Sequence, residues 1–321
     1  MLNPALFEKN SLELVSTRKG YGEGVLEAGK QDENVVVLTA DLKVSTYSHL
    51  FAEAFPERFF DVGVAEQNMA GIAAGLALSG KVPFMASYGV FSPGRNWEQV
   101  RVSICYSDAN VKVVGSHGGL SVGADGATHQ ALEDIALVRC LPGMTVVVPC
   151  DYFEAKKATL ALAQMKGPAY LRLARAKTPV LTKEKDTFEI GKAQVWQKGA
   201  DILFIACGPI LYEVILAARE LETRGKSCGI INCATVKPLD EKTILKEVEG
   251  LAENGGMVVT VEDHQRIGGL GSAIAELLGE HAPVKMKILG VDDRFGESGS
   301  YEELLAKYGL NAKGIVEVVL S

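Results

Sequence analysis

The sequence predicts an α/β protein of two domains, each with a mainly parallel β-sheet flanked by helices. The chain has 321 residues and a hydrophobic content of 47%, and single cores seldom grow much beyond about 250 residues, so two packed cores are expected. Short β-branched segments alternate with helix-like segments, which is typical of parallel sheets covered by helices. A polar, lysine-rich stretch without periodicity separates two such groups of segments.

The expected strands follow one another along both groups. In the first group they lie within residues 34–41, 59–64, 82–89, 110–116, 144–150 and 169–174. In the second group they lie within residues 201–207, 228–233, 256–263 and 284–291. We take the polar stretch 175–191 as the linker, so the predicted domains are 1–185 and 186–321.

The composition argues against several classes of protein. A net charge of −7 is unfavourable for a general nucleic-acid binder, because a phosphate backbone needs a basic face. The charge-free stretch 67–80 is shorter than the roughly 18 to 20 apolar residues of a membrane-spanning helix. The N-terminus lacks the pattern of a signal peptide, so a cytoplasmic location is expected. Six cysteines without a CxxC pair are expected to be reduced thiols rather than zinc ligands.

One acidic residue has an unusual setting. In "DVGVAEQNMAGIAAGLALSG", residues 61–80, Glu66 stands directly before a run rich in glycine and alanine. A glutamate in the first turn of a helix is common, because the helix dipole favours it. The small residues, however, suggest that another backbone packs closely against this helix. A carboxyl group sealed there would have its pKa raised by desolvation and could donate a proton to a ligand nitrogen.

Two other polar regions follow expected strands. Ligands of open parallel sheets bind just beyond the C-terminal ends of the strands. Asp41 stands at such an end, after "VVVLTA". The stretch "SHGGLSVGADGATHQ", residues 116–130, follows another strand and is long for a connection. We therefore expect a functional loop there.

Together these motifs resemble a known family. "DVGVAEQNMAGIAAGLALSGKVPFMASYGVF" and "GADGATHQALEDIALVRCLPGMTVVVPCD" resemble the pyrimidine-binding domain of the thiamine-diphosphate enzymes of the transketolase family. The likeness continues through the second half of the chain. It implies a pyrimidine-binding domain followed by a transketolase C-terminal domain, which is the C-terminal half of transketolase as a separate subunit.

The resemblance implies a cofactor site around Glu66. In this family a glutamate at that position hydrogen-bonds N1′ of the thiamine aminopyrimidine and so helps to form the reactive ylid. Phe91 matches the aromatic residue on which the ring stacks, Tyr88 lies beside it, and Asp41 matches an aspartate near the cofactor. Both aromatic residues could instead be ordinary core residues. Many transketolases carry a further aromatic residue where this chain has Gly94, which leaves the far wall of the slot open.

The resemblance also implies a site for a sugar phosphate. Transketolases move a two-carbon ketol unit from a ketose phosphate to an aldose phosphate, as in the pentose phosphate pathway. The family's phosphate-contacting positions fall on Arg18, Ser45, His117 and Arg175. Asp125 matches a residue that contacts a substrate hydroxyl. His129 matches a catalytic residue that contacts the donor, and its alternative role is a hydrogen bond that organises the loop.

Other activities remain open at this point. Many transketolases have "REH" where this chain has "AEQ", residues 65–67. The same letters occur in deoxyxylulose-phosphate synthase, and "EQN" occurs in β subunits of 2-oxoacid dehydrogenases. The alternatives are therefore a subunit similar to either of these enzymes, or a noncatalytic scaffold subunit. Retention of the four phosphate-contacting residue types favours transketolase.

The sequence lacks the "GDG…NN" motif that anchors thiamine pyrophosphate through Mg²⁺. If the resemblance holds, an N-terminal transketolase subunit supplies that motif and the magnesium ligands. We therefore expect no metal ligand on this chain, a two-plus-two heterotetramer, and transketolase activity only with the partner. The second domain shows no cluster of acids, bases or cations, and a structural role is expected for it.

Overall fold

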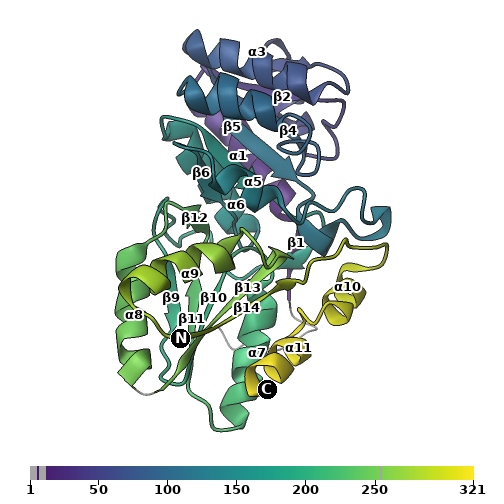
Figure 1. The fold of residues 1–321 in the computed structure, drawn as a ribbon. Coiled ribbons are helices and arrows are strands. Elements are labelled where there is room, and N and C mark those ends of the chain that lie inside the picture. The colour runs from purple at the N-terminus through teal and green to yellow at the C-terminus, as the bar shows by residue number, and fades with distance from the viewer. Residues whose placement is uncertain (1–5, 7–11, 254) are drawn as a thin grey trace.

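The computed structural model describes residue 6 and residues 12–253 and 255–321. Within these residues the chain forms two large sheets, which lie in two lobes of the molecule (Figure 1). The sheet of the first lobe has the strand order β12-β6-β7-β5-β4-β2-β3. Its strands are β2 (Val35–Thr39), β3 (Phe59–Asp61), β4 (Val82–Tyr88), β5 (Lys112–Ser116), β6 (Thr145–Val147), β7 (Ala169–Arg172) and β12 (Thr235–Lys237). Neighbouring strands are parallel, except that β12 pairs antiparallel with β6.

The sheet of the second lobe has the strand order β14-β13-β10-β11-β9. Its strands are β9 (Gln194–Gln197), β10 (Ile202–Ala206), β11 (Cys228–Asn232), β13 (Met257–Gln265) and β14 (Lys285–Val291). Only the β9–β11 pair among these is antiparallel. A further short antiparallel pair joins β1 (Leu14–Val15) to β8 (Thr178–Pro179), inside the predicted linker. The predicted α/β class with mainly parallel sheets is confirmed.

Helices cover both faces of each sheet. The first lobe has α1 (Thr17–Gln31), α2 (His49–Ala54), α3 (Glu66–Leu78), α4 (Trp97–Gln99), α5 (Asp134–Arg139) and α6 (Tyr152–Gln164), with the short helices η3 (Pro56–Arg58), η4 (Val100–Tyr106) and η5 (Gly119–Asp125). The second has α7 (Leu211–Thr223), α8 (Glu241–Glu253), α9 (Leu270–His281), α10 (Tyr301–Lys307) and α11 (Ala312–Leu320). In this described part, no helix is both long enough and apolar enough to cross a membrane.

The central strand β2 shows why the first sheet is covered on both faces. Successive side chains of a strand point to opposite faces, and all five residues of β2 are buried. Val36 and Leu38 belong to the cluster that contains Met69 of α3. Val35 and Val37 belong to the cluster that contains α1 and α6. A fully apolar strand is therefore the expected result of burial between two helical layers.

The two lobes are joined more closely than a linker requires. Strand β12 comes from the second half of the chain but lies at the edge of the first sheet, beside β6 (Figure 1). One apolar cluster includes Val146 of the first sheet and both Ile205 and Val258 of the second. The sequence suggested two separate cores, whereas this cluster continues from one sheet to the other. The boundary at residues 185 and 186 stays a prediction.

A buried ion pair also lies at this junction. Arg172 of β7 donates from Nε to Oδ2 of Asp134 at 2.8 Å. Its Nη2 atom donates to the carbonyl oxygens of Ala131 and Asp263, both at 2.9 Å. Asp134 is 1% exposed and Arg172 is 7% exposed. The guanidinium therefore ties β7 and α5 to strand β13 of the second lobe.

Candidate active site

Glu66 is the first residue of α3, directly after the turn that follows β3. The residue is 1% exposed. The hydroxyl of Ser87, at the end of β4, donates to its Oε1 atom at 3.2 Å. The guanidinium of Arg95 donates from Nη1 to its Oε2 atom at 2.7 Å. The amide of Asn96 donates to its backbone carbonyl at 3.1 Å, so both ends of Glu66 are fixed.

The surroundings of this carboxyl differ from the expectation in one respect. We expected a sealed group that donates its own proton to a ligand nitrogen. In the free chain the carboxylate instead accepts hydrogen bonds, and one donor is a cation. Arg95 is 47% exposed on its side chain, so it reaches from the surface to a buried partner. The difference arises because Arg95 lies 29 residues after Glu66 in the sequence and meets it only in the folded chain.

Aromatic rings lie around the guanidinium that binds this carboxylate. The guanidinium carbon of Arg95 lies 4.7 Å from the centroid of the Phe91 ring. Tyr88 lies nearly parallel to Phe91, with centroids 5.9 Å apart. His129 meets the Phe91 ring edge-on, at 5.4 Å and 78°. The structure thus brings Glu66, Phe91, Tyr88 and His129 into one region; their roles at a cofactor stay a prediction.

Gly94 stands where many transketolases carry a further aromatic residue, and the backbone around it is tightly packed. A Cβ atom at this position would lie 2.0 Å from the carbonyl oxygen of Val90. No side chain fits there without a shift of the backbone. The N–H of the next residue, Arg95, bonds to the carbonyl of Phe91 at 2.9 Å. Arg95 is the side chain that extends from this segment, and its guanidinium lies between Glu66 and the Phe91 ring.

The four residues predicted to contact phosphate also come together. Arg18, near the start of α1, donates from Nη1 to the carbonyl of Ser45 at 2.5 Å and from Nη2 to the carbonyl of Arg175 at 2.9 Å. Its Nη1 atom lies 3.4 Å from Nε2 of His117. Arg175 in turn donates to the carbonyl of Val122 at 2.5 Å. Residues from four separate parts of the chain thus form a group with two cations.

His117 is held neutral within this group. It is 2% exposed, and Ser116 Oγ lies 2.8 Å from its Nδ1 atom. Burial, together with the positive charges of Arg18 and Arg175, lowers the pKa of His117 to about 2. Burial likewise lowers the pKa of Arg18, and Arg175 adds to this effect. The imidazole therefore offers hydrogen bonds, while the arginines supply the charge.

The second lobe supports the long loop 116–130. Asp263 of β13 accepts from the N–H of Leu120 at 2.8 Å. A Cβ atom on Gly119 would lie 2.4 Å from the carboxyl carbon of Asp263, so only glycine fits at this approach. Gln130 donates to the carbonyl of Glu297 at 3.0 Å. These contacts fix the loop to the second lobe.

Two predicted site residues lie at the surface. Asp125 is exposed at the end of η5. Asp41 is also exposed, with a φ of +61°, and its N–H bonds to Asp61. Neither side chain joins the ion pair of Glu66 in the free chain. Across the described ranges, no group of three or more His, Cys, Asp or Glu residues is arranged to hold a metal ion.

Three residues of this site were not predicted from the sequence: Ser87, Arg95 and Asn96. Ser87 lies on β4, one residue before Tyr88, and its hydroxyl meets Glu66 only after the sheet forms. Arg95 follows Phe91 by four residues, a spacing that places two side chains on one side of a helical turn. That spacing was the available signal for Arg95. Asn96 contacts a backbone carbonyl, and no spacing of residues in the sequence indicates such a contact.

The small residues of α3 divide between two faces. Ala70, Ala73 and Ala74 are buried against the first sheet. Gly71 and Gly75 are exposed, and a Cβ atom on either would have no heavy atom within 4 Å. The close packing expected around these glycines therefore does not come from within this chain. An exposed face with two glycines therefore remains on the helix that begins at Glu66, and the 67% exposed Leu78 lies on the same face.

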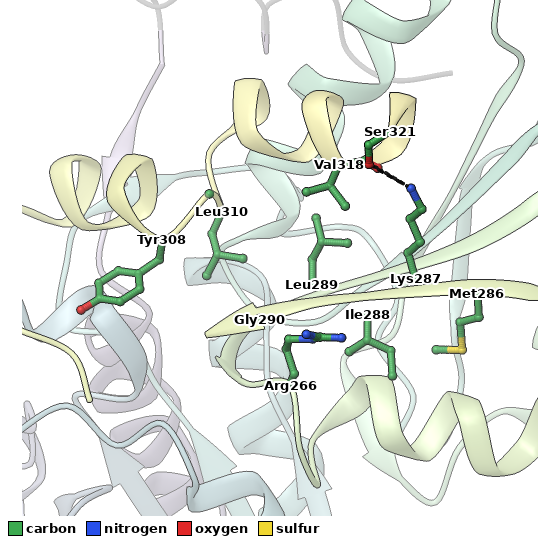
Figure 2. A pocket seen from close by; sticks show the side chains of 11 residues that line it. Arg266, Met286, Lys287, Ile288, Leu289, Gly290, Tyr308, Leu310, Val318 and Ser321 are labelled. Atoms are coloured by element: carbon green, nitrogen blue, oxygen red, sulfur yellow. Dashed lines mark hydrogen bonds between the residues drawn. The ribbon is translucent and has the colours of Figure 1, made fainter. Parts of the chain in front are cut away.

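A hollow of about 530 Å³ lies elsewhere, between β14 and α11 of the second lobe (Figure 2). Its lining is mainly apolar, with Ile288, Leu289 and Val318 among its residues. Lys287 donates to the carbonyl of Val318 and to the hydroxyl of Ser321. These bonds hold the end of α11 over the sheet edge. We assign no site there.

Comparison with known protein families identifies the chain. The model of the transketolase pyrimidine-binding domain matches residues 13–180. The model of the transketolase C-terminal domain matches residues 191–315. The chain therefore belongs to the transketolase family. It carries that family's pyrimidine-binding and C-terminal domains, as the resemblance implied.

Several relatives share this extent. The putative transketolase C-terminal section of Methanocaldococcus jannaschii is 45% identical, over 94% of this chain and 95% of that protein. The 6-deoxy-6-sulfo-D-fructose transketolase subunit of a Clostridium species is 42% identical, over 93% and 92% of the two chains. A solved split-gene transketolase, described as an inactive β4 tetramer, has 42% identity and a TM-score of 0.88, over 95% and 97%.

Proposed function

We propose that this chain is the C-terminal subunit of a split transketolase, which transfers a two-carbon ketol unit between a ketose phosphate and an aldose phosphate. Thiamine diphosphate would bind between this chain and an N-terminal partner. The observation that carries the proposal is the buried carboxylate of Glu66 beside the ring of Phe91. The stack of Tyr88 on His117 connects this position directly to the cations Arg18 and Arg175.

The residues around Glu66 fit an aminopyrimidine. The carboxylate is shielded from water, its direction is fixed by Ser87, and an aromatic face lies beside it. Glu66 would hold the ring nitrogen N1′, and Phe91 would support the ring. When bound, thiamine diphosphate supplies the carbanion chemistry of ketol transfer. The Mg²⁺ ligands would come from the partner chain, with the pyrophosphate.

The Arg18–Arg175 pair fits the anionic end of a sugar. Two guanidinium groups suit the planar and bidentate recognition of phosphate oxygens. His117 is neutral, so it would add a hydrogen bond without adding charge. A sulfonate offers the same three oxygens, and a relative is a sulfofructose transketolase subunit. We propose a phosphate as the anion, and a sulfonate is the alternative that this relative favours.

His129 and Asp125 would act along the sugar chain. His129 is only partly buried, at the edge of the Phe91 ring. Thr128 Oγ1 lies 2.8 Å from its Nδ1 atom, so its Nε2 atom is available for a donor substrate. A histidine can both donate and accept hydrogen bonds near neutral pH. The exposed carboxylate of Asp125 would accept from a substrate hydroxyl.

Assembly is part of the proposal. We infer a two-plus-two heterotetramer in the cytoplasm, in which the open glycine face of α3 packs against another chain. The solved relative of 42% identity forms a β4 tetramer that is described as inactive. This supports the expectation that the isolated chain is inactive. The active site would then be complete only between chains.

The test is reconstitution of the two chains. The purified chain is mixed with the partner that carries the "GDG…NN" motif, thiamine diphosphate, Mg²⁺ and pentose phosphates, and ketol transfer is measured. Glu66→Gln keeps the size of the side chain but loses the carboxylate, and it should abolish transfer. Arg224→Met, which breaks an exposed ion pair with Glu220, should leave transfer unchanged. Full activity of Glu66→Gln would contradict the proposal.

The choice of donor separates the alternatives. A synthase similar to deoxyxylulose-phosphate synthase would use pyruvate as donor, and a dehydrogenase β-like subunit would use a 2-oxoacid. Turnover of either donor without a ketose phosphate would replace the present proposal. A scaffold subunit would bind no thiamine diphosphate even with the partner present.

A further inference from the structure

We propose that Arg95 occupies the place of the aminopyrimidine in the free subunit, so that the cofactor has to displace it. The inference rests on the proposed function for the identity of the ligand. It is carried by two contacts of one guanidinium group. That group donates to Glu66 Oε2 at 2.7 Å and lies 4.7 Å from the centroid of the Phe91 ring.

These two contacts are the ones that an aminopyrimidine would need. A guanidinium is planar, carries N–H donors in its plane and stacks on aromatic faces. It therefore satisfies the carboxylate and the ring at the same time. A heterocycle that bonds to Glu66 and lies on Phe91 cannot do so while Arg95 is there. The two occupants exclude each other.

The free subunit has a physical reason to keep this arrangement. Glu66 is 1% exposed, and a buried carboxylate without a partner is strongly destabilising. Ser87 donates to only one of its oxygens. Arg95 supplies a charge-assisted bond to the other oxygen. The ion pair thus stabilises the unliganded site.

Arg95 also has a route out of the site. Its side chain is 47% exposed, so the guanidinium can rotate into solvent and be hydrated there. Its backbone stays in place, because its N–H bonds to the carbonyl of Phe91. Displacement therefore needs a rotation of one side chain and no rearrangement of the loop. The cost is loss of the ion pair, which lowers the affinity for the cofactor.

The experiment is a binding titration of the two-chain complex. Thiamine diphosphate is added in the presence of Mg²⁺, and the dissociation constant is measured by calorimetry for wild type, Arg95→Met, Arg95→Gln and Arg224→Met. Arg95→Met removes the competing cation, so the dissociation constant should fall by about tenfold, which corresponds to one charge-assisted hydrogen bond. Arg95→Gln keeps a hydrogen-bond donor without charge, so its dissociation constant should lie between those of wild type and Arg95→Met. Arg224→Met should match wild type.

A second measurement tests the pair without any ligand. Arg95→Met should lower the unfolding temperature of the isolated chain, but it should have little effect in a Glu66→Gln background. Equal effects in both backgrounds would overturn the proposed pairing. An unchanged or weaker affinity of Arg95→Met would overturn the displacement, while the proposed function would stand. Failure of the wild-type complex to bind thiamine diphosphate would overturn both.

Discussion

The ring of His117 lies over the ring of Tyr88, with centroids 3.7 Å apart and planes inclined by 26°. Tyr88 also stacks on Phe91, and His117 lies beside Arg18. One continuous set of contacts therefore runs from the ring next to Glu66 to the cations. The two halves of the candidate site are parts of a single packed unit, and a change in one is expected to affect the other.

His117 should make the stability of the chain sensitive to acid. Its pKa in the folded chain is about 2, whereas that of an unfolded histidine is about 6.5. The unfolded chain therefore binds a proton below about pH 6.5 that the folded chain does not bind, and stability falls as the pH falls. Between pH 7 and pH 5 this amounts to about 2 kcal/mol. In His117→Asn that loss should disappear.

Urea unfolding of both proteins at pH 7 and pH 5 measures this difference. Asparagine is chosen because residue 117 has a φ of +58°, a conformation that asparagine tolerates better than most residues. An equal acid-induced loss in wild type and variant would show that His117 is protonated in the folded chain.

Loss of the buried ion pair at the domain junction should be costly. Arg172→Met leaves the buried carboxylate of Asp134 without its cation, for which about 3–5 kcal/mol of unfolding free energy is expected. Arg224→Met breaks an exposed pair and should change the same quantity by about 0.5 kcal/mol or less. Denaturant titration of both variants provides the comparison. Similar values for the two would mean that Asp134 finds another partner.

The approach of Asp263 to the long loop can be tested with two glycines. Gly119 and Gly143 both have positive φ, of +69° and +74°. A Cβ atom on Gly143 would meet nothing within 4 Å, whereas one on Gly119 would meet Asp263. Gly143→Ala should cost only backbone strain, about 1–2 kcal/mol. Gly119→Ala should lower the unfolding temperature further, because it also separates Asp263 from Leu120.

The open face of α3 gives a test of assembly. Gly71→Leu places a large side chain on this face, where the chain itself offers no obstacle, so the isolated subunit should fold normally. Packing against another chain should be blocked. Gly279→Leu on α9 is the matched control, since that glycine is also helical with nothing within 4 Å of a Cβ atom. Each variant is mixed with the partner and its assembly is measured by sedimentation. Gly71→Leu should give a smaller assembly than wild type, and Gly279→Leu should not.

Much of the fold follows from local patterns. Each predicted strand region overlaps an observed strand, although β13 (Met257–Gln265) extends beyond its predicted region. Most of these strands are buried and parallel, and such strands have continuous apolar runs. Strand β12 was not predicted, since its three residues carry no such run and its partner β6 belongs to the other lobe. The pairs β1–β8 and β9–β11 were missed for a similar reason: they are short, and their partners lie far away in the sequence.

The candidate site was only partly predictable. The position of Glu66 at the start of a helix follows from the residues around it. The grouping of Arg18 with Arg175, 157 residues apart, has no local signal, and only the family resemblance suggested it. The ion pair of Glu66 with Arg95 was not predicted, because the two residues are 29 positions apart and the resemblance implies only a cofactor contact for Glu66.

The strand that crosses between the lobes limits how this polypeptide can be divided. A fragment that stopped in the linker would leave the outer edge of β6 with unpaired backbone groups, and such edges recruit strands from other molecules. The fragment with the second domain would carry β12 without β6, the strand with which it pairs. Expression of the pyrimidine-binding half alone is therefore expected to give aggregates.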